Sequence, residues 1–117
     1  MEEFGTYRNL EVWKKSVELV RAVYSLLKRF PADERYALTD QVRRAVISVP
    51  SNIAEGNGRN SNRDYAHFLS IAKGSLFEVM NQLNIAVTLG YIERKEIPED
   101  LAIEIKKMLF AMIRKYE

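Results

Sequence analysis

The sequence predicts an all-α protein, an antiparallel up-down-up-down four-helix bundle, and three observations lead to that prediction. Apolar residues recur at steps of three and four along nearly the whole chain, which is the period of a helix face. Proline, glycine and N-capping residues interrupt this pattern at intervals. The resulting connections, near residues 31–33, 57–61 and 91–97, are short, and short connections join antiparallel neighbours.

The composition fits one domain spanning residues 1–117. Apolar residues make up 47% and charged residues 29%, which are ordinary proportions for a globular protein with one core. No cysteine is present, which excludes disulfides, thiolate metal ligands and cysteine nucleophiles. The opening residues 1–5 have no apolar h-region, and no apolar run approaches the ~18 residues of a membrane span. We therefore expect a cytoplasmic protein with no membrane partner.

The first predicted helix, residues 8–30, carries two apolar stripes side by side. The heptad stripe consists of Leu10, Trp13, Val17, Val20, Tyr24 and Leu27, and the second stripe consists of Val12, Leu19, Val23, Leu26 and Phe30. A helix that packs against one partner needs only one stripe, so the width predicts neighbours on two sides, within the bundle or across subunits. Trp13 is expected to be buried in the core or in an interface.

The second predicted helix begins within residues 31–34, where proline and acidic residues suit a first turn. Its core face is Leu38, Val42, Ala45, Val46, Val49 and Ile53. Pro50 interrupts this face and removes a backbone hydrogen bond, so one helix kinked at Pro50 is predicted in preference to two short helices. Gly56 marks the C-terminus of this helix and is expected to have a positive φ.

The third predicted helix starts at Ser61, which forms a capping-box-like pattern with Asp64, and Gly90 ends it. Gly74 in its middle costs about 1 kcal/mol of helix propensity relative to alanine, so another backbone is expected to approach there. Its core seam is Tyr65, Leu69, Ala72, Leu76, Val79, Leu83 and Ala86. The last helix begins at Pro98 and buries Leu101, Ile105, Met108, Leu109 and Met112.

The sequence contains no catalytic set, so we expect a protein that is not an enzyme and has no cofactor, no metal and no small-molecule substrate. His67, the only histidine, follows Asp64 at the carboxylate-x-x-His spacing of di-iron bundles, but the second copy that such a site needs is missing. No serine has an identifiable base, because a lone histidine cannot be assigned to one of them. The run from Gly56 to Gly58 is too short for a phosphate-binding loop.

Several polar residues lie on or next to core-forming segments, where burial without a hydrogen-bond partner costs about 1–3 kcal/mol each. They are Asn52, Glu55, Arg59, Glu78, Asn81 and Gln82. One interpretation is a hydrogen-bonded cluster that locks the turn between the second and third helices. The other is a binding surface for a partner.

Positive charge is concentrated in the first helix. Residues 8–30 hold six Lys and Arg against two Glu, a net charge of +4, whereas the whole chain carries +2. Lys14, Arg21 and Lys28 repeat every seven residues and share one helix face. Arg43 and Arg44 are adjacent and point about 100° apart, so one of them is expected to pair internally. A solvated face and a set of phosphate contacts are both consistent with these five residues.

One set of motifs is distinctive and consists of Gln41-Val-Arg-Arg-Ala45, Ser48-Val-Pro-Ser-Asn-Ile-Ala-Glu-Gly56, Gly58-Arg59, Phe68-Leu69, Ala72-Lys-Gly-Ser75, Glu78 and Gln82-Leu83. Together these motifs are similar to those of one bacterial family, the four-helix-bundle family of the 23S rRNA intervening-sequence proteins. The opening Tyr7-Arg-Asn-Leu-Glu-Val-Trp13 and the turn from Phe30 to Arg35 also resemble this family, so the resemblance covers nearly the whole chain. The accessory protein of diversity-generating retroelements is a more distant relative.

The resemblance implies a small bundle that assembles into homopentamers and has no catalytic residues. It implies that the family-motif positions, Asn52, Glu55, Gly56, Arg59, Gly74, Ser75 and Glu78, form and pack the turn between the second and third helices. The retroelement relative works with a reverse transcriptase and binds nucleic acid. The leading hypothesis is therefore a homo-oligomeric helical scaffold that presents a surface to nucleic acid, RNA above all, or to a nucleic-acid-associated protein. The alternative is a structural or protein–protein interaction adaptor with no nucleic-acid role.

Overall fold

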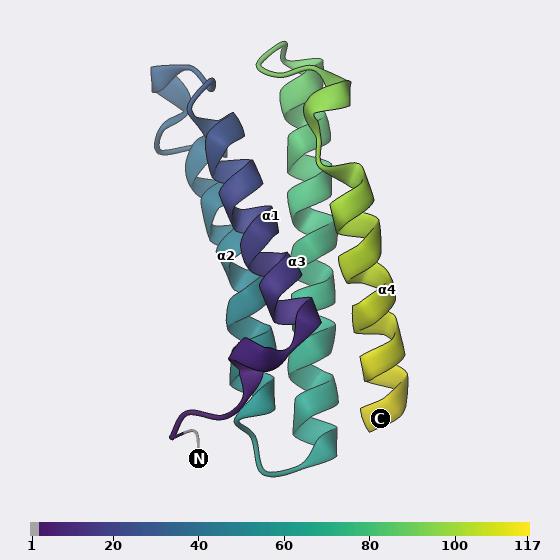
Figure 1. Ribbon diagram of the computed structural model, residues 1–117. Coiled ribbons are helices and arrows are strands. Elements are labelled where there is room, and N and C mark those ends of the chain that lie inside the picture. Colours follow the sequence, from purple (N-terminus) through teal and green to yellow (C-terminus); the bar gives the residue numbers. More distant parts are fainter. Residues whose placement is uncertain (1–2) are drawn as a thin grey trace.

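Four long helices make up most of the computed structural model, which describes residues 3–117 (Figure 1). They are α1 (Glu11–Leu27), α2 (Leu38–Asn57), α3 (Asn62–Thr88) and α4 (Glu99–Tyr116), and short 3-10 turns lie at η1 (Tyr7–Asn9), η2 (Ala32–Glu34) and η3 (Arg94–Glu96). The described part contains no strand, so the predicted all-α class with four helices is confirmed. Met1 and Glu2, which belong to the segment used to argue against a secretory signal, lie outside the described residues.

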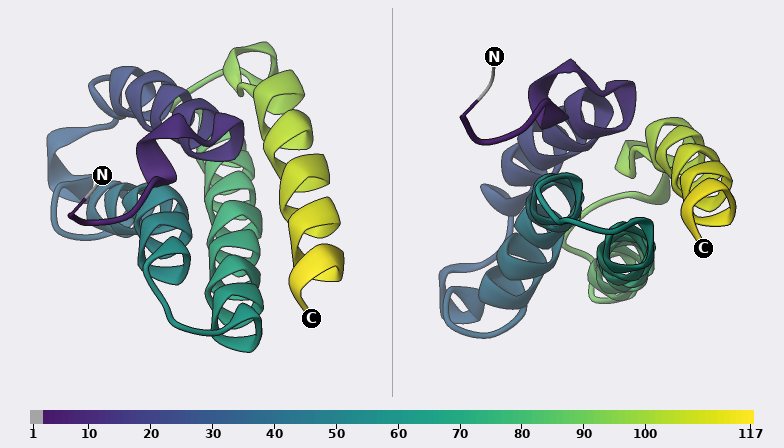
Figure 2. Two further views of the ribbon diagram at one scale, coloured as in Figure 1. Left: turned by 60° about the horizontal axis from the view of Figure 1, so that its bottom comes forward. Right: turned by 90° about the horizontal axis from the view of Figure 1, so that it is seen from below.

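The molecule is elongated, with extents of 44 × 25 × 19 Å, and its connections alternate between two ends (Figure 1). The α1–α2 and α3–α4 connections lie together at one end, where the Tyr91 hydroxyl donates to Glu34 Oε2 at 2.6 Å. The views in Figure 2 show α3 between α2 and α4. Among the helix pairs that pack side by side, contact is most extensive between α2 and α3 and least extensive between α1 and α4.

The core is built from one buried stripe on each helix. The large side chains that are fully buried are Leu19, Val23, Val42, Val46, Val49, Ile53, Leu69, Leu76, Val79, Leu83, Ile105 and Leu109. All members of the predicted α3 seam are buried, as expected. On α1 the second stripe faces the core, whereas only Leu27 of the heptad stripe is buried.

The start of α2 differs from the prediction, because the chain makes a 3-10 turn at Ala32–Glu34 before the helix begins at Leu38. Ala37 interrupts helical geometry with φ −120° and ψ −108°. Glu34 Oε1 accepts the backbone N–H of Leu38 at 3.2 Å, so this acid caps the later helix instead of lying within its first turn. Pro50 lies inside one uninterrupted helix, as predicted, and the bend at Pro50 stays a prediction.

The predicted ends of α3 are confirmed by their hydrogen bonds. Ser61 Oγ accepts the N–H of Asp64 at 3.1 Å, which satisfies a free donor of the first turn. At the other end Gly90 has φ +83°, and Tyr91 N–H reaches the carbonyl of Ala86 at 3.0 Å. This pattern is a Schellman cap, in which glycine adopts the left-handed conformation at little steric cost. No described helix combines the length and hydropathy that crossing a bilayer requires.

Candidate functional site

Gly56 brings α2 and α3 close together beside their connection. It lies within α2, which continues to Asn57, and the described glycines with positive φ are Gly5 and Gly90. The expectation of a positive φ at Gly56 is therefore wrong, because the helix continues beyond the point at which the glycines suggested an end. A Cβ at Gly56 would lie 2.9 Å from Phe68 Cβ and 3.0 Å from Tyr65 Cδ1. Packing between two helices, and not backbone conformation, explains this glycine.

Gly74 lies in a different environment. It is exposed in the middle of α3, and a Cβ built there would meet no atom of the chain within 4 Å. The predicted approach of another backbone is therefore wrong for this chain, because Gly74 lies on the outer side of α3. The next residue, Ser75, is buried and faces α2.

A small polar network joins α2 and α3 at mid-height. Ser48 Oγ lies 2.8 Å from Ser75 Oγ, and Asn52 Nδ2 donates to both the hydroxyl and the carbonyl oxygen of Ser48 at 2.8 Å. Asn52 and Ser75 thus lie along the helix–helix contact and not in the turn to which the family motif was assigned. The side chains satisfy one another where two helices pack closely.

The other polar motif residues form separate pairs, so the prediction of a single locking cluster is wrong. Glu55 and Arg59 form an exposed ion pair at 3.6 Å, and the Arg59 guanidinium lies 4.6 Å from the ring centroid of Phe68. Farther along α3, Gln82 Nε2 donates to Glu78 Oε2 at 3.2 Å. Glu78 and Gln82 lie several turns beyond the α2–α3 connection, because α3 is a long straight segment of 27 residues. Asn81 is exposed on the same helix.

Acidic neighbours offset the positive charge of three of the five residues predicted to contact phosphates. Lys14 lies 3.6 Å from Glu11, and Arg43 and Arg44 both contact Asp40, at 3.5 and 3.0 Å. Only one of the two arginines was expected to pair. The remaining two residues are Arg21 and Lys28, which lie exposed at one-heptad spacing along and just beyond α1.

The heptad stripe of α1 lines an apolar groove between α1 and α2 that the pattern alone did not locate. The groove has a volume of about 310 Å³ and is lined by Tyr7, Trp13, Val17, Val20, Ile47, Pro50, Ser51 and Ala54. The Tyr7 and Trp13 rings meet edge to face, with centroids 5.3 Å apart. Trp13 is only half-buried, so its predicted full burial requires something outside this chain.

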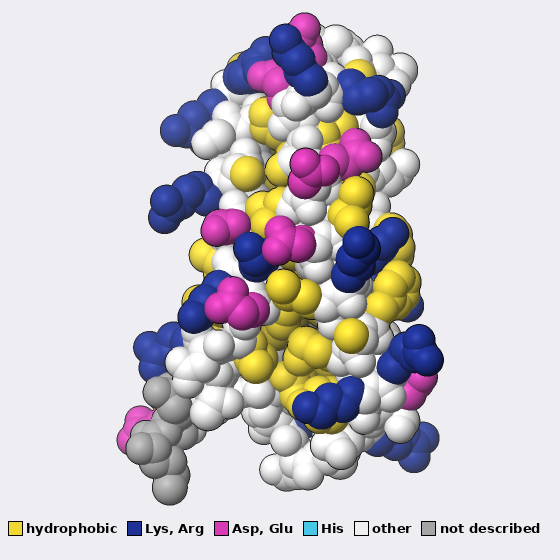
Figure 3. Space-filling model, turned by 45° about the vertical axis from the view of Figure 1, so that its right-hand side comes forward, with side chains coloured by type: hydrophobic (Ala, Val, Ile, Leu, Met, Phe, Trp, Pro, Cys, Tyr) yellow, Lys and Arg dark blue, Asp and Glu magenta, His cyan; other side chains and the backbone are white. Residues whose placement is uncertain are grey.

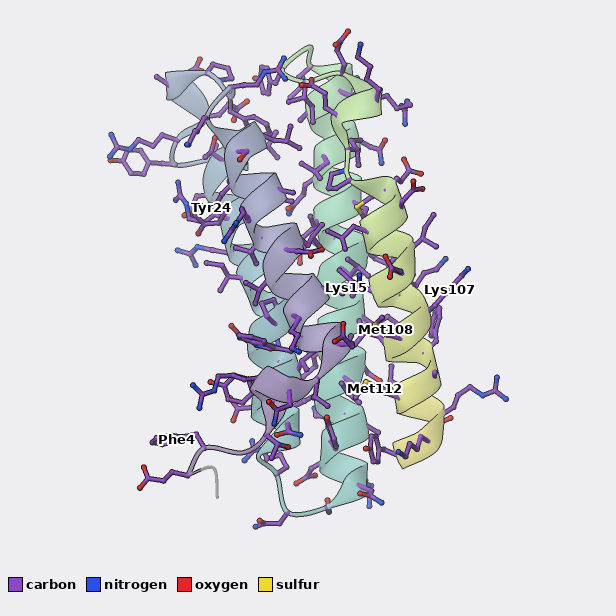
Figure 4. All side chains as sticks on the ribbon, viewed as in Figure 1. Phe4, Lys15, Tyr24, Lys107, Met108 and Met112 are labelled. Carbon is purple, nitrogen blue, oxygen red and sulfur yellow. The ribbon has the colours of Figure 1, made fainter. Side chains whose placement is uncertain are left out.

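A second groove lies between α1 and α4, which are in less contact than the other neighbouring helix pairs. Hydrophobic side chains gather along this side (Figure 3), and a hollow of about 300 Å³ is lined in part by Leu10, Met108 and Met112. Figure 4 labels Lys15 on α1 and both methionines on α4. Lys15 Nζ lies 3.2 Å from Glu104 Oε2, and this carboxylate raises the pKa of Lys15.

Within residues 3–117, no group of three or more His, Asp or Glu side chains is placed to hold a metal ion. His67 is exposed on α3, and its ring lies edge to face with Phe68 at 5.6 Å between centroids. Of the polar residues on or next to α2 and α3, Ser48, Asn52 and Ser75 join α2 to α3, whereas Glu55, Arg59, Glu78 and Gln82 form pairs between residues four apart.

Comparison with protein families agrees with this architecture. A family model described as "23S rRNA-intervening sequence protein" matches residues 8–111. The chain belongs to this family. A similar solved structure is a protein of unknown function from the S23 ribosomal protein family of Bacteroides thetaiotaomicron VPI-5482. The two are 26% identical, with a TM-score of 0.77, and the match covers 87% of this chain and 97% of the other. The resemblance drawn from the sequence is confirmed.

One curated relative of this family member is the Type II restriction enzyme DdeI of Desulfomicrobium norvegicum. It is 32% identical over 87 residues, which cover 68% of this chain. The matched part is 36% of the restriction enzyme, so the chain spans about a third of that relative's length.

Proposed function

We propose that this member of the 23S rRNA-intervening sequence protein family is a cytoplasmic, non-enzymatic, homo-oligomeric helical scaffold that presents a surface to RNA. The observation that carries the proposal is the apolar groove between α1 and α2, which the chain leaves open at its surface. Covering such a surface gains roughly 25 cal/mol for each Å² of apolar area removed from water. A second copy of the chain is the proposed cover.

Two features of the groove support assembly. Its α1 side is a heptad stripe, the spacing with which helices pack against other helices, while the second stripe supplies most of the buried core residues of α1. Its α2 side presents Ile47, a large aliphatic residue that is 42% exposed. A ring of subunits, five by family resemblance, would bury both sides and enclose Trp13.

Contact with RNA is supported by the comparisons and by charge. The family description refers to 23S rRNA. The restriction enzyme adds no support for RNA, because the chain spans only 36% of that enzyme, too little to transfer its activity. A chain with a net charge of +2 should bind a polyanion weakly. Assembly repeats each cationic surface, and several weak sites that act together raise apparent affinity by orders of magnitude.

The alternative function is a protein–protein interaction adaptor without nucleic-acid binding. The groove between α1 and α4 favours it, because Met108 and Met112 line this hollow and methionine side chains adapt to varied apolar partners.

Light scattering on the purified protein tests the assembly, with two glutamate variants as a matched pair. Ile47 and Ile85 are both 42% exposed, but only Ile47 lines the α1–α2 groove. We expect the parent to have about five times the 13.6 kDa chain mass, Ile47→Glu to be monomeric, and Ile85→Glu to remain assembled. A parent that stays monodisperse at 13.6 kDa would exclude the scaffold. If the parent binds neither structured nor single-stranded RNA at about 50 mM salt, where electrostatic binding is favoured, the adaptor function is retained.

A further inference from the structure

The outer side of α3 and α4 alternates cations with aromatic rings. Residues four apart lie on one side of a helix, so Lys73 and Phe77 form a line on α3, and Lys106, Phe110 and Arg114 form a line on α4. We call these five residues the α3–α4 face. On the lower right of Figure 3, Lys and Arg side chains lie beside hydrophobic ones.

The contacts show that the two lines belong to one surface. Lys73 Nζ lies 4.8 Å from the ring centroid of Phe110, so a cation from α3 rests against an aromatic ring from α4. Phe77 from α3 and Lys106 from α4 line the same hollow of about 200 Å³ between the two helices. Phe77 is 49% exposed and Phe110 is 40% exposed, so both rings are accessible to a partner.

The face has uncompensated positive charge. Within residues 3–117, the ion pairs are made by other basic residues, and Lys73, Lys106 and Arg114 have none. The acid that lines the hollow is Glu99, at the first residue of α4. Lys107 adds a fourth cation next to this face and points away from the bundle (Figure 4). The α1 strip differs, because Glu11 and Glu18 lie among its lysines and arginine.

We propose that the α3–α4 face binds unpaired nucleotides of an RNA strand, with bases stacked on Phe77 and Phe110 and phosphates in contact with Lys73, Lys106 and Arg114. The inference rests on the proposed function and identifies the surface and the kind of RNA. Exposed rings between cations suit single strands, because every unpaired base has a face that can stack on an aromatic ring. A base inside a duplex is already stacked and cannot reach either ring.

A second copy of the chain fits this face poorly. Lys73, Lys106 and Arg114 have no acidic partner among the described residues of the chain, so covering this face with another copy would remove three unpaired charges from water, which is costly. The centres of protein–protein interfaces are also depleted of lysine. The α1–α2 groove, which is lined mainly by apolar residues, lacks this obstacle.

Fluorescence anisotropy measures how much the three cations contribute to RNA affinity. The probe is labelled oligo(U) RNA of about 15 nucleotides, a length within the usual site size of single-strand binding folds. The test variant carries K73Q, K106Q and R114Q, and the control carries K14Q, R21Q and K28Q, so both lose the same charge. We expect the test variant to bind at least 10-fold more weakly than the parent. The slope of log affinity against log salt concentration should fall in magnitude by about 2, since each of the three phosphate contacts contributes roughly 0.7. The control should change affinity less than threefold. Equal weakening in both variants would overturn the proposal.

The contribution of base stacking to RNA affinity is tested with the variants Phe77→Leu and Phe110→Leu. Phe4→Leu is the control. Phe4 is 81% exposed on the N-terminal segment, away from this face (Figure 4). Each stacked base contributes on the order of fivefold in affinity or more, so both test variants should weaken binding by at least that factor while the control does not. Oligo(dT) should bind like oligo(U), because neither contact needs a 2′-hydroxyl group. Duplex RNA that binds as tightly as oligo(U) would refute stacking.

Two further outcomes separate this inference from the proposed function. If either phenylalanine variant loses assembly in light scattering, the face is a subunit contact and the inference is wrong, while the scaffold stands. If the parent binds RNA and neither the lysine–arginine variant nor the phenylalanine variants weaken it, RNA binding stands and this surface is wrong. If the parent binds no RNA, both the RNA function and this inference are rejected.

Discussion

Two glycines inside helices have opposite roles at the scale of single residues. Gly56 lies against Phe68 and Tyr65, where α2 and α3 approach too closely for any side chain. Gly74 has open space where its Cβ would be. Both have ordinary helical φ, so the difference between them comes from neighbouring side chains and not from the backbone.

Alanine substitutions at these two glycines should therefore have opposite effects. Gly56→Ala forces a methyl group into an occupied contact and should lower the free energy of unfolding by about 1–3 kcal/mol. Gly74→Ala should raise it by about 0.5–1 kcal/mol, since alanine restricts the unfolded chain and favours a helix. Urea denaturation followed by circular dichroism measures both. A Gly74→Ala protein less stable than the parent would indicate that another backbone does approach Gly74 in the assembled protein.

At the scale of elements, Glu34 is one of the residues that hold the bundle together at the end away from the α2–α3 connection. Glu34 accepts the N–H of Leu38 with Oε1 and the hydroxyl of Tyr91 with Oε2. It thereby joins the start of α2 to the connection between α3 and α4. The hydrogen bond to Glu34 raises the pKa of Tyr91 to about 12, because loss of the phenolic proton would place two negative charges together.

This hydrogen bond predicts a defined pH dependence of stability. The folded-state pKa of Tyr91 lies above its ordinary value of 10.0, so the contribution is fully present below pH 10 and is lost as the pH rises towards 12. We expect the parent to lose more stability than Tyr91→Phe between these pH values. Urea midpoints measured at several pH values from 9 to 12.5 provide the comparison, and other tyrosines and lysines cancel in the difference. Parallel curves for the two proteins would contradict the assigned hydrogen bond.

At the scale of the whole molecule, α1 is the helix that connects fold to function. Its second stripe completes the core, and its heptad stripe, with the half-buried Trp13, remains beside the groove to α2. The α3–α4 face uses different helices. The two proposals thus place assembly and RNA binding on separate surfaces, so we expect that substitutions can alter one without the other.

Trp13 is the only tryptophan, so its fluorescence reports directly on the groove. Assembly should exclude water from the indole and shift emission to shorter wavelength. We expect Ile47→Glu to emit at longer wavelength than the parent at every concentration, whereas Ile85→Glu emits like the parent. Dilution of the parent until light scattering reports a monomer should produce the same red shift. Unchanged emission across that dilution would place Trp13 outside the subunit contact.

The sequence by itself determined the all-α class with four helices, the caps of α3 and the family. Helical periodicity and capping depend on residues three or four positions apart, so the α3 seam, the Ser61 cap and the Gly90 cap could be predicted locally. The family motif could be recognised for a related reason, because its residues lie in two short runs of the chain.

The tertiary structure alone decided which apolar stripe of α1 faces the core and where the α3–α4 face lies. It also decided which polar motif residues join α2 to α3 and which form separate pairs. These depend on which sides of the helices meet, a property of residues far apart in sequence. Ser48 meets Ser75 and Lys73 meets Phe110 only because antiparallel helices place them at the same height. Gly56 is the clearest case that the sequence left undecided, because a turn and a close helix contact both favour glycine. Only the position of Phe68 in the structure shows that the close contact is the explanation.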